Sequence, residues 1–134
     1  MEFKTITSSE IDACKKLYED VGWSVYLKDE QAFKTMFYNA LYTLGAYDKG
    51  QLVGLIRMIG DDAHILYIQD ILVLKKYQGQ GIGRKLLSLG LDKFAHVRQK
   101  VLLTDDDPNT VGFYQSCGMK KAQDLKLVSF VRFD

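Results

Sequence analysis

Residues 71–87 read ILVLKKYQGQGIGRKLL and hold the most informative pattern in the chain. The stretch begins inside an apolar run, residues 65–74, which is typical of a strand buried on both faces. Gly79, Gly81 and Gly83 follow at every second position, and an amphipathic helical pattern comes next. The segment therefore predicts a strand, a glycine-rich turn and a helix whose first N–H groups have no backbone partner.

Such a turn is suited to phosphate. Glycines let the backbone approach a ligand closely, and the free amides at a helix N-terminus bind an anion. Four basic residues surround the turn: Lys75, Lys76, Arg84 and Lys85. We therefore expect a phosphate-bearing ligand at this place.

Other glycine-rich loops fit the sequence less well. A Walker A loop is excluded because no G-x-x-x-x-G-K-[ST] is present. The dinucleotide fingerprint G-x-G-x-x-G is a closer competitor, since Gly79 and Gly81 match it and Asp105 ends the next expected strand. Against it, Arg84 stands at the third glycine position and the loop does not follow the first strand. A turn without any ligand is the remaining alternative, although glycine at a helix start costs up to about 1 kcal/mol relative to alanine.

Periodicity along the rest of the chain predicts a mixed α/β fold. Helices are expected at 9–20, 29–39, 83–98 and 108–117, where Pro108 and Gly118 mark the two ends of the last one. Strands are expected at 44–47, 52–59, 65–74, 101–104 and 125–133, the first two forming a hairpin. We predict one α/β (α+β) domain over residues 1–134, with a mixed, twisted sheet flanked by helices.

Composition excludes several classes of protein. A length of 134 residues with 47% hydrophobic residues predicts one folded domain rather than a disordered chain. The net charge of +1 favours neither a nucleic acid nor a membrane surface as partner. Because no signal peptide or membrane-spanning run is evident, we expect a cytoplasmic protein. Cys14 and Cys117 lack metal-site spacing, so we expect two buried, reduced thiols and no metal.

Two motifs resemble the GNAT superfamily of N-acetyltransferases. Residues 78–83, QGQGIG, match the family's [RQ]-x-x-G-x-[GA] acyl-CoA loop, and the strand before them is similar to the one that precedes that loop. Residues 109–119, NTVGFYQSCGM, are similar to the family's N-x-x-A-x-x-F-Y-x-x-x-G-F segment, with a shorter spacing after Asn109. The order of the expected elements also agrees with the family.

The resemblance implies a mostly antiparallel sheet with a cleft for acetyl-CoA between splayed central strands. Backbone groups of Ile71, Leu72 and Val73 would pair with the pantetheine arm. The pyrophosphate would be held by the loop residues Gln78, Gly79, Gln80, Gly81, Ile82, Gly83 and Arg84. Asn109 would bond the pantetheine, or serve only as a polar residue in the first turn of its helix.

Acetyl transfer to an amine needs a proton for the departing thiolate and a neutral nitrogen. Tyr114 matches the family's general acid; the alternative is a tyrosine that only packs or bonds the cofactor. Asp70 could take the ammonium proton through a water, or satisfy buried backbone donors instead. A substrate of low pKa would need no dedicated base.

The acceptor is predicted to be a primary amine of a small molecule or peptide. The family builds its acceptor site from the N-terminal helices, which here supply the aromatic residues Trp23, Tyr26, Phe33, Phe37, Tyr38 and Tyr42. Core packing is the alternative for each of them. Other hypotheses for the whole chain are a CoA-binding regulatory module without turnover and an acyltransferase for longer chains. The expected strand at 125–133 offers an edge for a homodimer.

Overall fold

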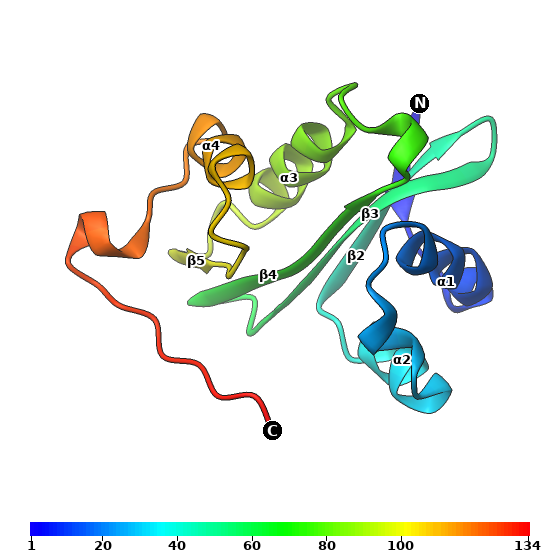
Figure 1. Cartoon of the computed structure of the whole chain (residues 1–134), viewed down its shortest axis with the longest axis horizontal. Helices are drawn as coiled ribbons and strands as arrows, with labels where there is room; N and C mark the ends of the chain where they lie inside the picture. The colour runs from blue at the N-terminus through cyan, green and yellow to red at the C-terminus, as the bar shows by residue number, and fades with distance from the viewer. The chain divides into compact units, whose positions relative to one another are not determined.

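A five-stranded sheet with the order β1-β2-β3-β4-β5 organises residues 1–103 of the computed structural model (Figure 1). All residues from Met1 to Asp134 are described, and they fall into two units, 1–103 and 104–134. The strands are β1 (Glu2–Thr5), β2 (Tyr42–Asp48), β3 (Gln51–Gly60), β4 (Ile65–Val73) and β5 (Gln99–Val101). The first four pair in antiparallel fashion, and β5 runs parallel to β4.

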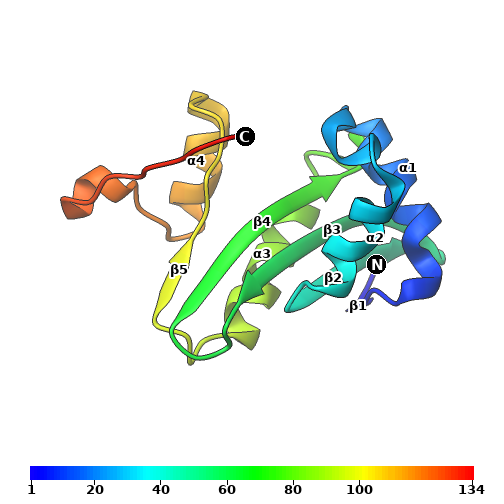
Figure 2. The same cartoon turned by 90° about the horizontal axis from the view of Figure 1, so that it is seen from below.

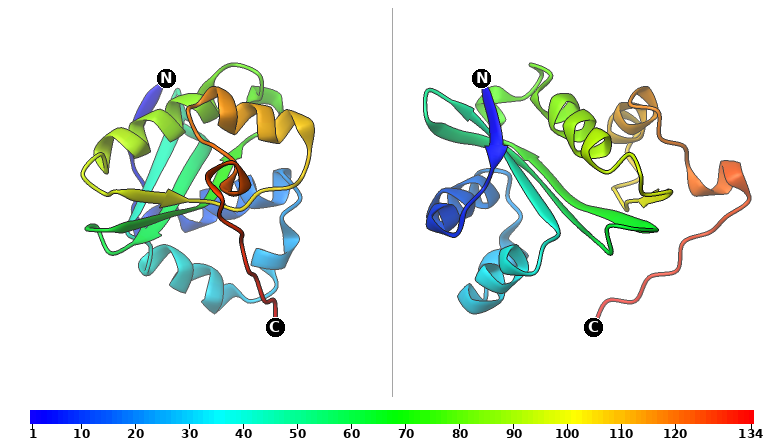
Figure 3. Two further views of the ribbon diagram at one scale, coloured as in Figure 1. Left: turned by 90° about the vertical axis from the view of Figure 1, so that its left-hand side faces the viewer. Right: turned by 180° about the vertical axis from the view of Figure 1, so that it is seen from behind.

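Helices cover both faces of this sheet. α1 (Ile11–Asp20) and α2 (Glu30–Tyr38) lie on one face, and α3 (Ile82–Lys93) lies on the other (Figure 3). Short 3-10 turns, η1 (Ser8–Glu10), η2 (Ser24–Leu27) and η3 (Lys75–Tyr77), connect them. α2 begins where the sequence predicts, because the Asp29 carboxylate accepts a hydrogen bond from the Ala32 N–H at 3.1 Å.

The sheet has a core on each side. Towards α1 and α2 it consists of the buried residues Cys14, Leu17, Tyr18, Phe33, Tyr47, Leu52, Leu55 and Leu72. Towards α3, Gly90 allows the helix to approach β3, since a Cβ there would collide with the side chain of Met58. Because both faces are covered, β3 is buried almost throughout, as apolar strands of this kind require.

The second unit contains α4 (Pro108–Ser116) and η4 (Ala122–Leu125). Pro108 occupies the first turn of α4, and Gly118 follows its end with φ +91°. The Met119 N–H donates to the Tyr114 carbonyl at 3.1 Å and the Gly118 N–H to Gln115 at 3.0 Å, which is a Schellman motif. The helix therefore starts and stops on the signals seen in the sequence.

The structure confirms the mixed α/β class and its mostly antiparallel sheet, and it corrects some elements. The strand expected at 125–133 is wrong: after η4 the chain forms no regular structure and pairs with no strand. β1 was not predicted, since four residues offer too little pattern. β5 begins two residues before the expected strand, and α3 ends at Lys93 instead of continuing to 98. None of the helices combines the length and apolar composition that crossing a bilayer requires.

Candidate functional site

The sheet opens between β4 and β5. β5 pairs with β4 only at Ile65–Tyr67, so residues 68–73 of β4 have no strand beside them on that edge (Figure 2). On the other edge, the Leu74 N–H donates to the Val53 carbonyl at 2.9 Å. Hydrogen-bonding direction alternates along an antiparallel strand, so Leu72 also faces β3. The backbone groups of Ile71 and Val73 therefore point to the open edge, whereas those of Leu72, included in the predicted contact, do not.

The glycine turn follows this open edge directly. Gly79 and Gly81 have φ of +80° and +82°, and a Cβ at either position would lie in open space. They are therefore needed for backbone conformation and not to avoid a collision. The first helical hydrogen bond joins the Lys85 N–H to the Gly81 carbonyl at 3.0 Å. The amides of Ile82 and Gly83 precede this bond at the start of α3, and amides at a helix N-terminus can bind an anion.

Three side chains hold the base of the turn in place. The Asp20 carboxylate at the end of α1 accepts from the Lys75 N–H at 2.7 Å. The Tyr77 hydroxyl donates to Asp48 in the β2–β3 hairpin at 2.8 Å. Gln78 Nε2 donates to the Val73 carbonyl at 2.9 Å, across the entrance to the turn. These bonds connect the turn to the end of α1, to the β2–β3 hairpin and to the end of β4. They hold the backbone amides of the turn in a defined position.

A β-bulge lies in β4 two residues before Ile71. Arg57 of β3 is opposite Asp70, but Met58 is opposite Ile68, which leaves Gln69 as an extra residue. Bulges re-aim side chains, and this one turns two successive residues to the same face. Gln69 Nε2 and Asp70 Oδ1 both contact the Tyr26 hydroxyl, at 3.0 and 2.9 Å.

Asp70 is the centre of a buried polar network. Its side chain is paired with Arg57, whose Nε and Nη2 each lie 2.7 Å from Oδ2. The hydroxyl of Tyr18 donates to the same oxygen at 2.8 Å, and that of Tyr26 donates to Oδ1. Asp70 and Arg57 are only 2% and 4% exposed. Three donors thus share Oδ2, and the Tyr26 hydroxyl alone donates to Oδ1.

The charges in this network stabilise one another. Burial is the largest single influence and lowers the pKa of Arg57, but the charges of Asp70 and Tyr18 and the hydrogen bonds to them together raise the guanidinium pKa above its ordinary value. Burial, and then the Asp70 charge, raises the pKa of the Tyr26 phenol. Arg57 therefore stays charged and Tyr26 stays protonated. Asp70 satisfies buried side-chain donors here, and Oδ1 accepts only from Tyr26. The role of Asp70 as a base stays a prediction.

Tyr114 and Asn109 belong to the second unit. Tyr114 is half-buried in α4, and its ring lies 5.0 Å from that of Phe113, edge to face. Burial is the main cause that raises the pKa of Tyr114 above its ordinary value, so the phenol is protonated at neutral pH. Asn109 is exposed in the first turn of α4. Both roles predicted for these residues stay predictions.

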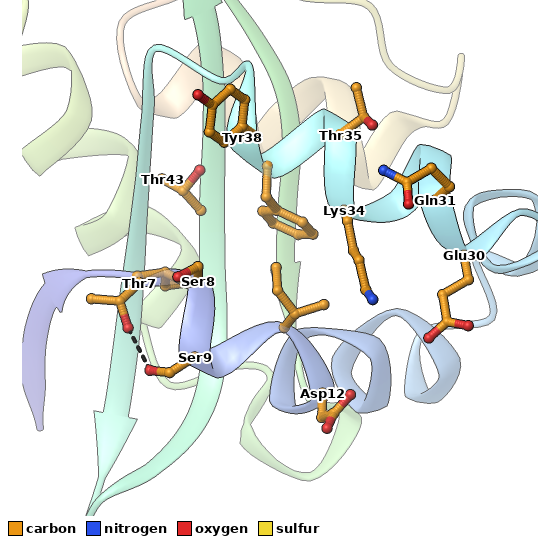
Figure 4. A pocket seen from close by; sticks show the side chains of 13 residues that line it. Thr7, Ser8, Ser9, Asp12, Glu30, Gln31, Lys34, Thr35, Tyr38 and Thr43 are labelled. Carbon is orange, nitrogen blue, oxygen red and sulfur yellow. Dashed lines mark hydrogen bonds between the residues drawn. The ribbon is translucent and has the colours of Figure 1, made fainter.

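Two cavities lie on the α1/α2 side of residues 1–103. The smaller, about 380 Å³, is lined by residues 22–26 together with Gln69 and Asp70. The larger, about 950 Å³, lies between η1, the start of α1 and α2, and includes Asp12, Glu30 and Lys34 (Figure 4). No residue of β4 or of the glycine turn lines the larger cavity. Only the smaller one contacts the bulge beside the open edge.

A comparison with known families identifies the arrangement. The family described as the acetyltransferase (GNAT) domain matches residues 14–133. The chain belongs to the GNAT acetyltransferase family. A GNAT family acetyltransferase from Streptococcus pneumoniae TIGR4 is 28% identical, with a TM-score of 0.86, over 99% of this chain and 96% of that one. The resemblance inferred from the two motifs is therefore confirmed.

Other relatives agree with this assignment. A probable acetyltransferase from methicillin-resistant Staphylococcus aureus is 25% identical, with a TM-score of 0.80, and 98% of each chain is covered. An uncharacterized N-acetyltransferase, ycf52-like, of Prochlorococcus marinus is 27% identical over 87% of this chain. The chain spans 66% of that relative's length. An uncharacterized N-acetyltransferase, ycf52, of Gracilaria tenuistipitata var. liui is 26% identical over 78% of this chain. The chain spans 58% of that protein's length.

Within this GNAT chain, the aromatic residues expected at the acceptor site do not form one wall. Trp23 and Tyr26 line the smaller cavity, whereas Phe33 is core. Tyr38 is almost fully exposed, and Tyr42 packs on Phe94, 5.6 Å between ring centroids. The prediction grouped these side chains together, but in the structure they point in different directions.

Sequence reasoning missed the partners of Asp70 in the GNAT sheet. Arg57 and Tyr18 are 13 and 52 residues away from it along the chain. One signal was present: Arg57 is the only charged residue in the apolar run 52–59, and a buried arginine requires an acid. Gln69 had no such signal, because nothing in the sequence marks the bulge.

Proposed function

We propose that the chain is an N-acetyltransferase that transfers the acetyl group of acetyl-CoA to a primary amine of a small molecule or peptide. Residues 1–134 act as one domain, and both substrates are bound together when transfer occurs. The observation that carries the proposal is the succession, within residues 71–83, of an open strand edge, a glycine turn and a helix N-terminus.

Each part of this segment has a role in binding acetyl-CoA. The outward backbone groups of Ile71 and Val73 bond the amides of the pantetheine arm, as a neighbouring strand would. The amides of residues 79–84 bind the pyrophosphate, aided by the positive end of α3. The open space beside Gly79 and Gly81 supports this fit, since a phosphate can approach the backbone there. Asn109 adds a hydrogen bond to the pantetheine.

The transfer is a direct displacement at the thioester. The amine nitrogen forms a bond to the carbonyl carbon, a backbone amide at the open edge of β4 stabilises the oxyanion, and the C–S bond then breaks. Tyr114 donates its phenolic proton to the departing thiolate, and the surplus proton on nitrogen leaves to solvent. The raised pKa of Tyr114 supports this assignment because the phenol is in its acid form at neutral pH.

The fold by itself does not identify the amine. Solved structures of the same fold include an aminoglycoside acetyltransferase in complex with sisomicin and a ribosomal-protein-alanine N-acetyltransferase from Brucella melitensis. These are 17% and 18% identical to this chain, with TM-scores of 0.74 and 0.75, a level that indicates fold alone. One acts on a small molecule by name and the other on a protein, so the acceptor must be inferred from the site.

Calorimetry with CoA, and with NAD as the control, tests the cofactor. We expect binding of CoA and none of NAD, and the reverse result would contradict the proposal. A thiol-release screen of acetyl-CoA against polyamines, amino acids, aminoglycosides, arylalkylamines and lysine peptides then tests turnover. CoA binding with no turnover of any amine would favour a regulatory CoA-binding module. Faster release from longer acyl-CoAs would favour a different acyl donor.

Replacing the proposed acid tests the mechanism. Tyr114→Phe should lower kcat by roughly 10²-fold or more, the usual contribution of general acid catalysis, without a large change in acetyl-CoA binding. The neighbouring Phe113→Leu is the matched control and should retain most of the activity. Unchanged turnover by Tyr114→Phe at every pH would show that Tyr114 only packs or binds the cofactor.

A further inference from the structure

The Tyr26 hydroxyl has a fixed hydrogen-bond direction. The Asp70 carboxylate forms an ion pair with Arg57 and accepts a hydrogen bond from the Tyr26 hydroxyl at 2.9 Å. The oxygen of Tyr26 then accepts from Gln69 Nε2 at 3.0 Å. A hydroxyl has one proton and two lone pairs, so one lone pair of Tyr26 remains.

Tyr26 and both partners of its hydroxyl line the smaller cavity. Tyr26, Gln69 and Asp70 all line this cavity, and the hydroxyl oxygen is where the three side chains meet. Since the proton of Tyr26 is committed to Asp70, the oxygen can receive a ligand's N–H or O–H but cannot donate to a carbonyl. The cavity lies beside the bulge, two residues before Ile71 at the open edge of β4.

Apart from Ser24, the rest of the cavity lining is apolar or glycine and carries no net charge. The rings of Trp23 and Tyr26 are tilted by 33°, with centroids 6.3 Å apart, and Val25 is largely exposed. Asp70 is the only charged residue in the lining, and Arg57 neutralises it. A ligand with several positive charges would find no free carboxylate here, whereas an apolar or aromatic group could pack on Trp23.

We propose that the Tyr26 hydroxyl accepts a hydrogen bond from the acceptor amine and orients it, and that this amine is carried by an apolar or aromatic group. Arg57 and Asp70 act through Tyr26 as positioning residues. The inference rests on the proposed function, since it assigns the amine to the cavity next to the acetyl-CoA edge. Its volume, about 380 Å³, is at the small end of ligand pockets and suits a small amine.

Tyr18 provides a matched control for the test. Tyr18 and Tyr26 both donate to Asp70, but Tyr18 is fully buried in the core and does not line the cavity. Tyr26→Phe and Tyr18→Phe therefore each remove one hydroxyl from the same carboxylate. Only the first removes the proposed contact to the amine. Thermal unfolding and CoA calorimetry of both variants confirm that each is folded and binds its first substrate.

The experiment measures steady-state thiol release with 2-phenylethylamine and spermidine as probes. We expect higher kcat/KM for 2-phenylethylamine in the wild-type protein. Tyr26→Phe should raise the KM for that amine by about tenfold, the effect of one lost hydrogen bond, and leave the KM for acetyl-CoA unchanged. Tyr18→Phe should lower the melting temperature with little change in the KM for the amine. Trp23→Ala should reduce the preference for 2-phenylethylamine over spermidine.

The outcomes separate this inference from the proposed function. If spermidine is the better substrate, or if Tyr26→Phe changes the KM for the amine no more than Tyr18→Phe does, the inference is wrong and the acetyltransferase assignment stands. If CoA binds but no amine in the screen is acetylated, the proposed function fails and the inference fails with it.

Discussion

Residues 1–103 and residues 104–134 differ in how their apolar side chains are placed. Every buried residue of the chain lies in the first region, where helices cover both faces of the sheet. The second region has none, and Phe130 is 92% exposed. Its helix α4 nevertheless starts at Pro108 and stops at Gly118, as the sequence predicts. Local signals are thus enough for a helix, while a strand or a core needs a partner.

The comparison predicts a large difference between core and C-terminal substitutions. Leu55→Ala removes a fully buried side chain and should lower the free energy of unfolding by about 2–5 kcal/mol. Phe130→Ala removes a larger but exposed side chain and should change it by less than about 0.5 kcal/mol. Urea denaturation measures both. A comparable loss in Phe130→Ala would mean that this residue packs against a partner in solution.

A second comparison of the two regions uses two glycines with positive φ, Gly81 in residues 1–103 and Gly118 in residues 104–134. Gly81→Ala and Gly118→Ala place a side chain at φ +82° and +91°, so each should cost about 1–2 kcal/mol of stability. Only Gly81 belongs to the proposed phosphate turn, so only Gly81→Ala should also weaken CoA binding severalfold. Calorimetry with CoA measures this. Equal CoA affinities for both variants would contradict the assignment of the turn.

The two cysteines should differ in reactivity. Cys14 in the core is fully buried, and burial raises the pKa of its thiol to about 12. Cys117 at the end of α4 is only half-buried, which corrects the expectation of two buried thiols. A disulfide reagent such as DTNB should therefore modify one thiol quickly in the native protein and both after denaturation. Cys117→Ser should abolish the fast reaction, and Cys14→Ser should leave it unchanged.

A smaller effect concerns acid stability. Three backbone N–H groups, from Ile65, Ala63 and His64, lower the pKa of Asp61 to about 2. Because the folded-state pKa lies below the ordinary value, the stabilisation is complete above about pH 4 and is lost as pH falls towards 2. The melting temperature of Asp61→Ala should be lower than wild type at pH 7, with a difference that shrinks near pH 2.

Asp124→Ala in the C-terminal region is the control for that measurement. Asp124 is exposed, and its carboxylate has no hydrogen-bond partner. The melting temperature of this variant should follow wild type at every pH. A difference between Asp61→Ala and wild type that does not change with pH would show that the Asp61 charge plays no part.

Much of the fold could be predicted because its elements carry local signals. The hairpin around Lys49 and Gly50, the cap at Asp29 and the long apolar run of β4 all agree with the structure. β1 was missed because it is a strand only by pairing with β2. The strand expected at 125–133 was wrong for the same reason, since alternating apolar residues form a strand only beside another strand.

The sequence by itself predicted the glycine turn and the start of α3, because glycine readily adopts the positive φ that Gly79 and Gly81 have there. The tertiary structure decided the rest of the candidate site. Pairing between strands decides where β5 leaves β4 and which backbone groups of β4 face outward. It also decides how the bulge at Gln69 turns Asp70 towards Arg57 and two tyrosines. These contacts join residues far apart in the chain, so no local pattern encodes them.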